Sequence, residues 1–510
     1  MPETAVYIPQ YDSGLQYEGE LSAAPVSTYL DRAKTMPLPF VFPVGLAGMS
    51  WLAGGIPLLT DAAFVVLTVL CGLRLLEELY NFPRRFGFGG IVIFGGILVW
   101  FCQDYLGNWI GNRSLVNSYV TYEVLAKATF FHMLFAMLMV CGLLLPWGKF
   151  VEKSINAIGK ISTPQLILGL LLAMLGISFL AYFIFGSDSP GATFLKLITL
   201  RAPFEQRWTV GRTGNLNYSW GGYVAQLIEL GMIASILGAA YTLLHRTPFL
   251  ILLFFWFSWV HFFLYNFYTS RRAPVVGMVL PIVVLLFVKY NAGAAAQFRR
   301  ISLKGYLALT IGGGLLFIAV QLQIAHRGTG FADFDFNRLE ASKIQGNSMF
   351  SEALDAWATI PSKRPFFANR FPGEGAVRAL PETAFWFAVG PIPRALWRDK
   401  PVDAAWASRA ETDVSGRENQ GTTVSSGLVG WWYFRFGAAG VVQGALLFGL
   451  LARIFERTLQ NADGRFLVIM FSLAYLTELF RMYRDFVFIG VYPVMIAQAL
   501  MWAGLRLFNR

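Results

Sequence analysis

Charged residues are scarce in this chain. Asp, Glu, Lys and Arg make up 14% of its 510 residues, whereas soluble domains carry about 25%. Hydrophobic residues make up 56%, and the polar linkers that would separate about three soluble domains in a chain of this length do not occur. The composition therefore excludes an ordinary soluble protein and indicates an integral membrane protein.

Cysteine and histidine are rare as well. The three cysteines, Cys71, Cys102 and Cys141, all lie in apolar segments, which argues against a disulfide framework or a paired-cysteine metal site. The four histidines are widely separated and lack the spacing of metal ligands. No glycine-rich phosphate loop, zinc-protease motif or nucleophile elbow occurs. We therefore expect no bound metal, nucleotide or other cofactor.

The chain carries a formal net charge of +11. A basic chain can bind nucleic acid, but no basic helix or aromatic-basic motif accompanies this charge. Lys and Arg that flank membrane spans on the cytoplasmic side account for most of the excess. The sequence therefore predicts that these basic residues contact membrane lipids and that the protein does not bind nucleic acid.

Apolar segments of near-spanning length follow one another along the chain, about twelve in all. Such long runs lack the alternation of barrel strands, so the expected fold is an all-α polytopic membrane protein with about 12 transmembrane helices. Gly54, Gly55 and Pro57 interrupt the first pair. The expected spans are residues 41–58, 61–80, 88–106, 122–146, 164–186, 219–244, 247–268, 273–290, 304–325, 427–454, 465–481 and 486–507.

The short loops predict the orientation of these spans. Lys and Arg concentrate in alternate loops, which are then cytoplasmic, as are both termini. Residues 1–40 form a cytoplasmic tail without the pattern of a signal peptide, and residues 41–325 form the first part of the bundle, with about nine helices. Residues 326–427 form one large extracytoplasmic loop, and residues 428–510 supply about three further helices.

The loops that this orientation leaves outside are rich in arginine and nearly free of lysine. Arginine presents a planar fork of donors that matches phosphate oxygens, so the set predicts a phosphorylated, lipid-linked ligand. For any single arginine, pairing with a nearby carboxylate or a lipid headgroup is the alternative. The candidate phosphate-binding residues are Arg207, Arg212, Arg271, Arg272, Arg394, Arg398, Lys400, Arg435, Arg481 and Arg484.

Two stretches near the end of the large loop stand out. In GPIPRALWRDKP, which ends at Pro401, Pro391 and Pro393 exclude regular helix and hold Arg394 in a defined place. In GTTVSSGLVGWWYFRFGAAGVV, which begins at Gly421, aromatic residues surround Arg435 at the entry to a span. A charge at such a position is costly and tends to mark function.

These two stretches resemble the Wzy-type polymerases of oligosaccharide repeat units. The resemblance implies a GT-C-like membrane glycosyltransferase at the periplasmic face of the bacterial inner membrane. It would transfer a growing glycan from undecaprenyl diphosphate to the sugar of another lipid-linked unit, with a flippase and a chain-length regulator as possible partners. The matching residues are Ile392, Pro393, Arg394, Leu396, Trp397, Lys400, Pro401, Gly430, Tyr433, Phe436, Gly437 and Gly440.

The implied chemistry needs no metal, because the diphosphate already activates the donor and arginines neutralise the charge of the leaving group. A carboxylate or histidine would deprotonate the attacking hydroxyl. Glu382, Glu411 and His326 are the main candidates, and a solvated loop charge is the alternative for each. Further candidates are Glu374 and Asp413 in the loop, and Glu229 and Glu478 in spans. The spacing of Glu478, Arg481 and Asp485 also favours a simple ion pair.

Two other functions fit the same features. An O-antigen ligase would use the same donor and topology but another acceptor. A flippase or transporter of lipid-linked oligosaccharide would show internal repeats, which we do not find, and has less need of a large loop.

Overall fold

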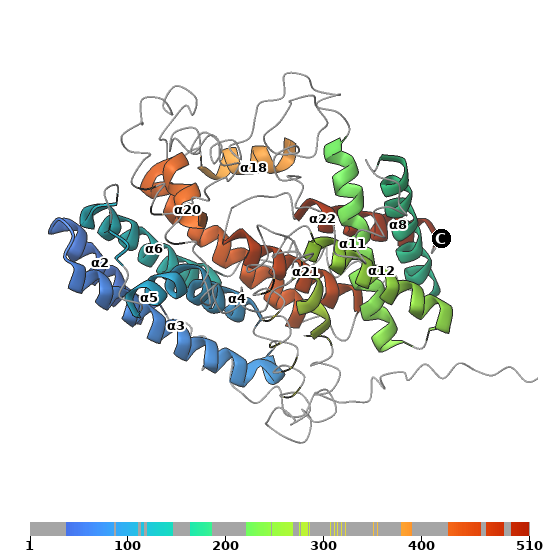
Figure 1. Ribbon diagram of the computed structural model, residues 1–510, viewed down its shortest axis with the longest axis horizontal. Coiled ribbons are helices and arrows are strands. Elements are labelled where there is room, and N and C mark those ends of the chain that lie inside the picture. Colours follow the sequence, from blue (N-terminus) through green and yellow to red (C-terminus); the bar gives the residue numbers. More distant parts are fainter. Residues whose placement is uncertain are drawn as a thin grey trace, which may run out of the picture.

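The computed structural model describes the backbone of a little over half of the chain. The described residues are 37–85, 88–110, 114–116, 120–145, 164–185, 221–245, 247–268, 275, 277–283, 285, 307, 311, 314, 318, 322, 350, 354, 357, 379–389, 427–460, 466–483 and 491–508. Within them the protein is almost entirely helical and contains no β-strand (Figure 1).

The helices follow the apolar segments of the sequence closely. The first group comprises η1 (Leu38–Phe40), α2 (Val41–Leu52), α3 (Pro57–Arg85), α4 (Phe88–Gly96), the π-helical η2 (Ile97–Cys102), α5 (Gln103–Ile110) and α6 (Tyr122–Leu143). The second comprises α8 (Pro164–Phe185), α11 (Gly221–Leu244), α12 (Phe249–Tyr268), α18 (Ala379–Val389), α20 (Gly427–Gln460), α21 (Phe466–Met482) and α22 (Val491–Phe508).

Five helical stretches in the described part are long and apolar enough to cross a membrane. They are Pro57–Tyr80, Phe88–Ile110, Tyr122–Leu143, Phe249–Phe267 and Phe436–Leu459. The protein is therefore an all-α protein with helices suited to a membrane, whereas the count of about twelve spans stays a prediction. The division into a cytoplasmic tail, two bundle parts and a periplasmic loop likewise stays a prediction.

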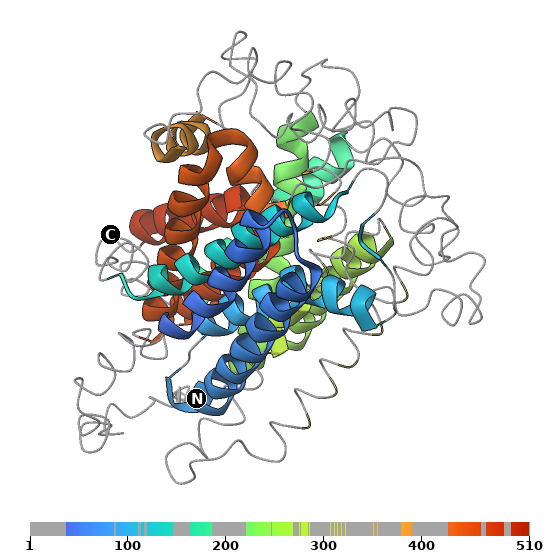
Figure 2. The same ribbon diagram turned by 90° about the vertical axis from the view of Figure 1, so that its left-hand side faces the viewer.

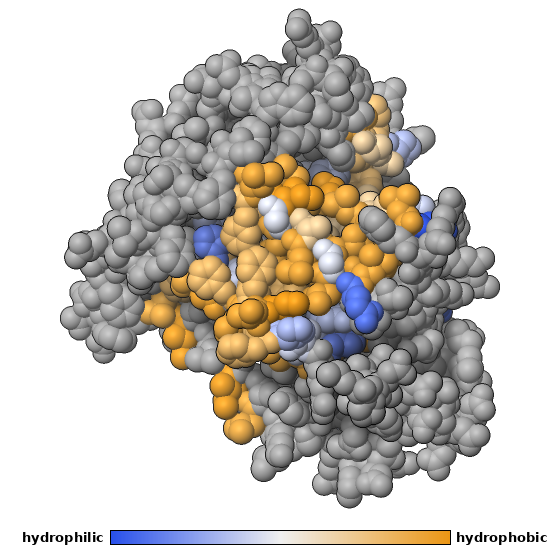
Figure 3. Space-filling view, turned by 90° about the vertical axis from the view of Figure 1, so that its right-hand side faces the viewer, coloured by the Kyte–Doolittle hydropathy of each residue, from blue (hydrophilic) through white to orange (hydrophobic). Residues whose placement is uncertain are grey.

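Apolar side chains also cover the outside of the described helices, as lipid contact requires. On α12, Phe249 and Leu250 are 70% and 77% exposed. Figure 3 shows the face at the α8 and α12 end of the molecule, where hydrophobic residues form most of the described surface. Such a surface would be unfavourable in water and suits acyl chains.

Local sequence signals explain where several helices begin. The Thr121 hydroxyl accepts a hydrogen bond from the amide of Val124 at 3.3 Å and caps α6. Proline, which suits the first position of a helix, begins α3 at Pro57 and α8 at Pro164. Between α2 and α3 the chain turns at Gly54 and Gly55, whose φ angles are +80° and +97°. The interruption expected in this first apolar pair is therefore a tight turn.

The described helices form two groups joined by the C-terminal helices. In Figure 1, α2, α3, α4 and α6 lie at one end of the molecule, whereas α8, α11 and α12 lie at the other. Helix α20 packs against α6, α4 and α21, and α22 packs against α11, α8 and α21. The last part of the chain therefore connects the two groups.

Small residues allow the closest of these contacts, between α6 and α20. A Cβ atom on Gly449 would lie 2.0 Å from the carbonyl oxygen of Met139, and one on Gly142 would lie 2.6 Å from that of Leu446. Glycines at such positions let two membrane helices approach until their backbones touch.

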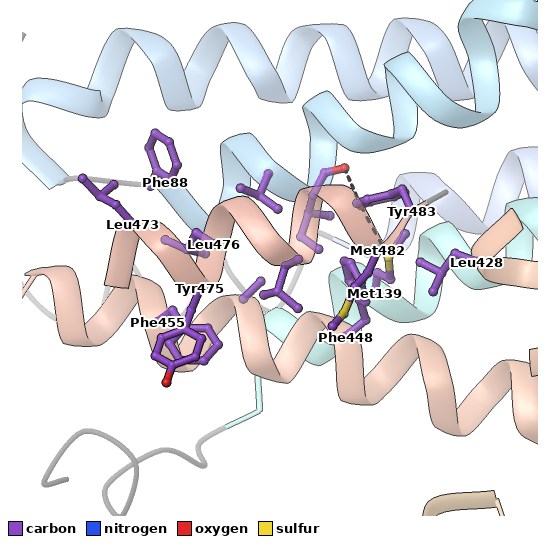
Figure 4. Packing of buried hydrophobic residues seen from close by; sticks show 14 of the residues in the cluster. Phe88, Met139, Leu428, Phe448, Phe455, Leu473, Tyr475, Leu476, Met482 and Tyr483 are labelled. Carbon is purple, nitrogen blue, oxygen red and sulfur yellow. Dashed lines mark hydrogen bonds between the residues drawn. The ribbon is translucent and has the colours of Figure 1, made fainter. Parts of the chain in front are cut away.

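Tyr483, directly after α21, connects the end of this helix to α4 and α20 (Figure 4). Its hydroxyl donates to the carbonyl of Ile93 in α4 at 3.0 Å, and its carbonyl accepts from the amide of Leu428 at 3.0 Å. Its ring packs edge-on against Phe448 of α20, with centroids 5.0 Å apart.

Helix α20 is bent. The sequence predicts one continuous span over residues 427–454 and does not predict this bend. Gly437 has φ +66° and ψ −159° inside the helix, a conformation that glycine adopts without steric cost. The segment before the bend folds back, so that a Cβ atom on Gly444 would lie 2.3 Å from the Trp432 ring. The stretch able to span a membrane begins only at Phe436.

Residues from the long segment between the two bundle parts are buried in the structure. Phe350, Leu354 and Trp357 are 1%, 1% and 2% exposed, and this spacing gives one face of a helix. Farther along, Tyr492 of α22 donates its hydroxyl to the carbonyl of Phe387 in α18 at 3.1 Å. At these positions the segment therefore packs against the helices on either side of it in the sequence.

Candidate functional site

Helix α21 carries an ion pair near its end. Arg481 Nη1 donates to Glu478 Oε1 at 2.6 Å, and the two side chains are 25% and 11% exposed. The pairing that their spacing suggested is therefore confirmed for Glu478, while Asp485 lies outside the described residues. A charged pair among apolar helices is costly to desolvate, so its presence calls for an explanation.

A small cavity of about 30 Å³ lies beside this pair, and we call it the Arg481 cavity. Four elements enclose it, namely α11, α21, α22 and residues 277–283. Its lining residues are Met232, Ile233, Ile236, Leu237, Gly277, Pro281, Met470, Ala474, Thr477, Glu478, Arg481 and Val494. The cavity has room for about two water molecules, and among the described residues Glu478 and Arg481 are the charged ones that line it.

A second carboxylate approaches the pair from the facing helix. Glu229 of α11 is close enough to interact electrostatically with both Glu478 and Arg481. If both carboxylates are ionised, the three side chains carry a net charge of −1. The two in-span glutamates that the sequence singled out thus come together around Arg481.

Hydrogen bonds at the edges of the cavity hold its walls in place. The Tyr475 hydroxyl donates to the side-chain carbonyl of Gln498 and ties α21 to α22. The Trp259 indole N–H donates to the carbonyl of Met278 at 3.3 Å, so α12 supports residues 277–283. The Thr477 hydroxyl turns back to the carbonyl of Leu473 at 2.8 Å.

This arrangement offers specific chemistry. A guanidinium has five N–H donors, and the hydrogen bond to Glu478 uses one of those on Arg481. The remaining donors suit a phosphate or another oxyanion. A carboxylate held beside such a site is also suited to accept a proton.

Most of the other predicted site residues lie outside the described residues. Glu382 is part of α18 and Arg435 is part of α20, with the backbone described at each position and the side chain not. Outside the described residues lie Glu411, His326, Arg207, Arg212, Arg271, Arg272, Arg394, Arg398, Lys400 and Arg484. Their roles in phosphate binding and in catalysis stay predictions.

The structure also draws attention to a residue that the sequence reasoning missed. Lys127 of α6 lies with its ammonium 5.8 Å from the ring centroid of Trp51 and 5.4 Å from that of Tyr433. We call these three residues the Lys127 site. A lysine within a largely apolar span is itself a signal of function. The criterion that singled out Glu229 and Glu478 in the sequence therefore applies to Lys127 too.

Densely packed aromatic rings surround the Lys127 site. Trp357 stacks on Tyr433 with centroids 4.3 Å apart, and Phe131 lies 4.5 Å from Tyr433. Nearby, the Tyr105 hydroxyl donates to the carboxylate of Asp61. Neither Asp61 nor Tyr105 was identified from the sequence.

In the described part of the chain, no group of three or more His, Cys, Asp and Glu residues is arranged to hold a metal ion. Independence of metal stays a prediction. Comparisons with protein families, with curated proteins and with solved structures find no match to this chain. The fold and the site define the class of the described part, an all-α protein with helices long and apolar enough to span a membrane and a charged cavity among its helices.

Proposed function

We propose that the protein is a membrane glycosyltransferase that polymerises lipid-linked oligosaccharide units. The carrying observation is the Glu478–Arg481 pair, which faces a cavity between apolar helices and lies within electrostatic reach of Glu229. An exposed pair on a lipid-facing surface would not support this proposal. A charged cavity within a helical bundle supports binding of a polar substrate from the membrane. Because Glu229, Glu478 and Arg481 sum to −1 when all three are ionised, an anionic substrate also requires further positive charge, which the proposal assigns to Arg271, Arg272 and Arg484.

The residues that line the cavity are also close in sequence to several of the predicted phosphate-binding arginines, which supports the proposal. Residues 277–283, which line it at Gly277 and Pro281, follow Arg271 and Arg272 within a few residues. Helix α21, which carries Arg481, ends shortly before Arg484. In the proposed orientation these arginines belong to the periplasmic side, where a lipid diphosphate and its glycan would be presented.

The proposed reaction is a displacement at the sugar carbon attached to diphosphate. A hydroxyl of the acceptor sugar attacks that carbon, and a new glycosidic C–O bond forms. The bond from the carbon to the diphosphate oxygen breaks, and the electron pair leaves with the diphosphate. The hydroxyl proton passes to a carboxylate or histidine, and arginines including Arg481 stabilise the charge that develops on the leaving group.

Among the described groups, Glu478 and Glu229 are the carboxylates at the cavity. Glu382, Glu411 and His326 remain the candidate bases in the large loop. The cavity volume of about 30 Å³ is far below that of a diphosphate-linked sugar. The proposed function therefore requires the elements that line the cavity to move apart when substrate binds, a rearrangement of the kind that some binding sites undergo.

The same membrane site would also serve an O-antigen ligase or a flippase, and one experiment separates the three functions. Purified protein is incubated with a synthetic polyprenyl-diphosphate oligosaccharide as the sole substrate, in the presence of EDTA. A ladder of longer glycans supports the polymerase. Transfer only after a different acceptor is added indicates a ligase, and movement across a vesicle membrane without bond formation indicates a flippase; either outcome overturns the proposal.

A further inference from the structure

We propose that Lys127 binds the phosphate group of a membrane lipid, at a site separate from the Arg481 cavity. The inference does not depend on the proposed function, because it concerns the opposite group of helices. Its basis is a lysine whose partners are aromatic rings on two other helices, next to a helix face that is apolar and exposed.

The first step concerns the location of the ammonium group. Trp51 lies in the last turn of α2, Tyr433 lies in α20, and both helices pack against α6. Lys127 is half-buried, so its charge lies at the junction of three helices and does not simply extend into solvent. The Trp51 ring is itself fixed by Phe130 and Phe131, with centroids 5.4 Å and 5.8 Å away.

The second step concerns the hydrogen-bonding capacity that remains. Aromatic faces attract a cation through their quadrupole but accept its N–H groups poorly. An ammonium has three donors, and among the described residues Lys127 forms no hydrogen bond or ion pair with an oxygen. Glu123 lies one turn earlier on α6 and is exposed, yet it makes no ion pair with Lys127. The donors are thus available to an anion from outside the protein.

The third step identifies the class of anion. An exposed apolar stripe runs from η1 along one face of α2, through Leu38, Phe42, Met49 and Leu52, which are 64%, 61%, 55% and 87% exposed. Leu52 directly follows Trp51 in the chain, so the stripe ends at the same turn of α2 as the Lys127 site, on an adjoining face of the helix. Figure 2 shows α2 and its neighbours on the outside of this end of the molecule. A ligand with an acyl or prenyl chain along α2 would bring its headgroup phosphate to Lys127.

The turn between α2 and α3 holds Trp51 in place relative to Lys127. A Cβ atom on Gly55 would lie 2.4 Å from the backbone of Tyr122, which begins α6. The end of α2 is therefore held against the start of α6, and Trp51 stays over Lys127. Two kinds of lipid carry the required phosphate, a phospholipid of the bilayer and a polyprenyl diphosphate, and both are tested below.

The test is a binding titration of the full-length protein in detergent. The probes are dihexanoyl phosphatidylglycerol and geranylgeranyl diphosphate, with geranylgeraniol as the uncharged control, and the readout is the ligand-dependent shift in Tm. We expect Lys127→Met to weaken binding of at least one phosphate probe by about tenfold or more, as loss of a charge-assisted contact implies. Whichever probe loses affinity identifies the source of the phosphate.

Three variants make the result specific. Lys127→Arg keeps the cation and should keep binding. Arg74→Met removes a cation that already pairs with Glu77 at 2.6 Å, and it should change nothing. Glu123→Gln removes the nearest carboxylate on α6 and should tighten binding, a test that holds even if Lys127→Met fails to fold. Equal affinity of wild type, Lys127→Met and Glu123→Gln for both phosphate probes would overturn the proposal.

Discussion

The helices around Lys127 and the helices around Arg481 are both apolar, but they pack in different ways. Around Lys127, rings such as Trp357, Tyr433 and Phe131 fill the interior and leave one cation at their edge. Around Arg481, the side chains leave a cavity and bring two carboxylates to one guanidinium. Interiors are normally filled to near-crystalline density, so a void lined by charges costs stability.

This difference suggests that the two regions have different roles, one in stability and one in function. The aromatic region supplies the packing that holds α2, α3, α6 and α20 together, whereas the Arg481 cavity has less packing and, in the proposed function, binds the substrate. Substitutions in the first region should therefore reduce stability, and substitutions in the second should reduce turnover. The predictions below test this comparison, beginning with the largest effect.

Truncation of Trp357 should have the largest effect on stability. The side chain is 2% exposed and stacks on Tyr433, so Trp357→Ala should lower the free energy of unfolding by about 3–5 kcal/mol. Unfolding by SDS in mixed micelles would measure it. Trp109→Ala, at a tryptophan that is 54% exposed, is the control and should change little. Equal effects of both variants would mean that the aromatic region is not a packed core.

Replacement of Arg481 by lysine should reduce turnover and leave the fold intact. Lysine keeps the charge opposite Glu478 but loses the fork of donors, and the lost contact to the leaving group should cost about 2–4 kcal/mol, or roughly a hundredfold in rate. Initial rates of glycan elongation would measure this. The matched control is Arg506→Lys, whose guanidinium lies over the Trp502 ring at 4.5 Å. Similar rates for both variants would show that Arg481 does not contact the leaving group.

An alanine at Gly55 should separate α2 from α6. Its φ of +97° and the 2.4 Å approach to Tyr122 both oppose a side chain, so Gly55→Ala should cost about 1–3 kcal/mol of stability. Gly45→Ala is the control, since a Cβ atom there meets nothing within 4 Å. Lipid binding at Lys127 should weaken in the Gly55 variant alone; unchanged stability and binding would contradict this account of the turn.

The smallest effect should come from His245, which follows α11. Burial lowers the pKa of His245, although a hydrogen bond from its ring to the carbonyl of Tyr241 partly opposes the shift. A lowered pKa in the folded state means that the unfolded chain binds the proton more tightly, so this contribution is present above about pH 6.5. It is lost as the pH falls through that value toward the lower folded pKa.

The measurement is the Tm between pH 7.5 and pH 5, which should fall less for His245→Phe than for the wild type. The His245 ring stacks on Tyr241 with centroids 4.2 Å apart, and phenylalanine retains that contact without titrating. An identical pH dependence for both proteins would show that His245 does not contribute.

The sequence predicted much of the fold because apolar length and local caps are local properties. The expected span of 122–146 corresponds to Tyr122–Leu143, and that of 164–186 to Pro164–Phe185. The bend at Gly437 was not predicted, because glycine at a helix interface and glycine at a kink look alike in one sequence.

The candidate site was predictable only in part, for the same reason. Glu478 and Arg481 are one helical turn apart, so their pairing could be inferred from spacing. The approach of Glu229 depends on how α11 packs against α21. Likewise, the two rings over Lys127 come from positions 51 and 433, which no local pattern connects.

The most direct test of the central claim is to map where a polyprenyl diphosphate binds. A probe with a photoreactive group beside the phosphates is cross-linked to the wild-type protein in EDTA, and the labelled peptides are identified by mass spectrometry. We predict label on α11, on α21 or on residues 277–283, and its loss from those peptides in Arg481→Lys. Label confined to α2, α3 and α12, and unaffected by Arg481→Lys, would contradict a diphosphate site at the Arg481 cavity.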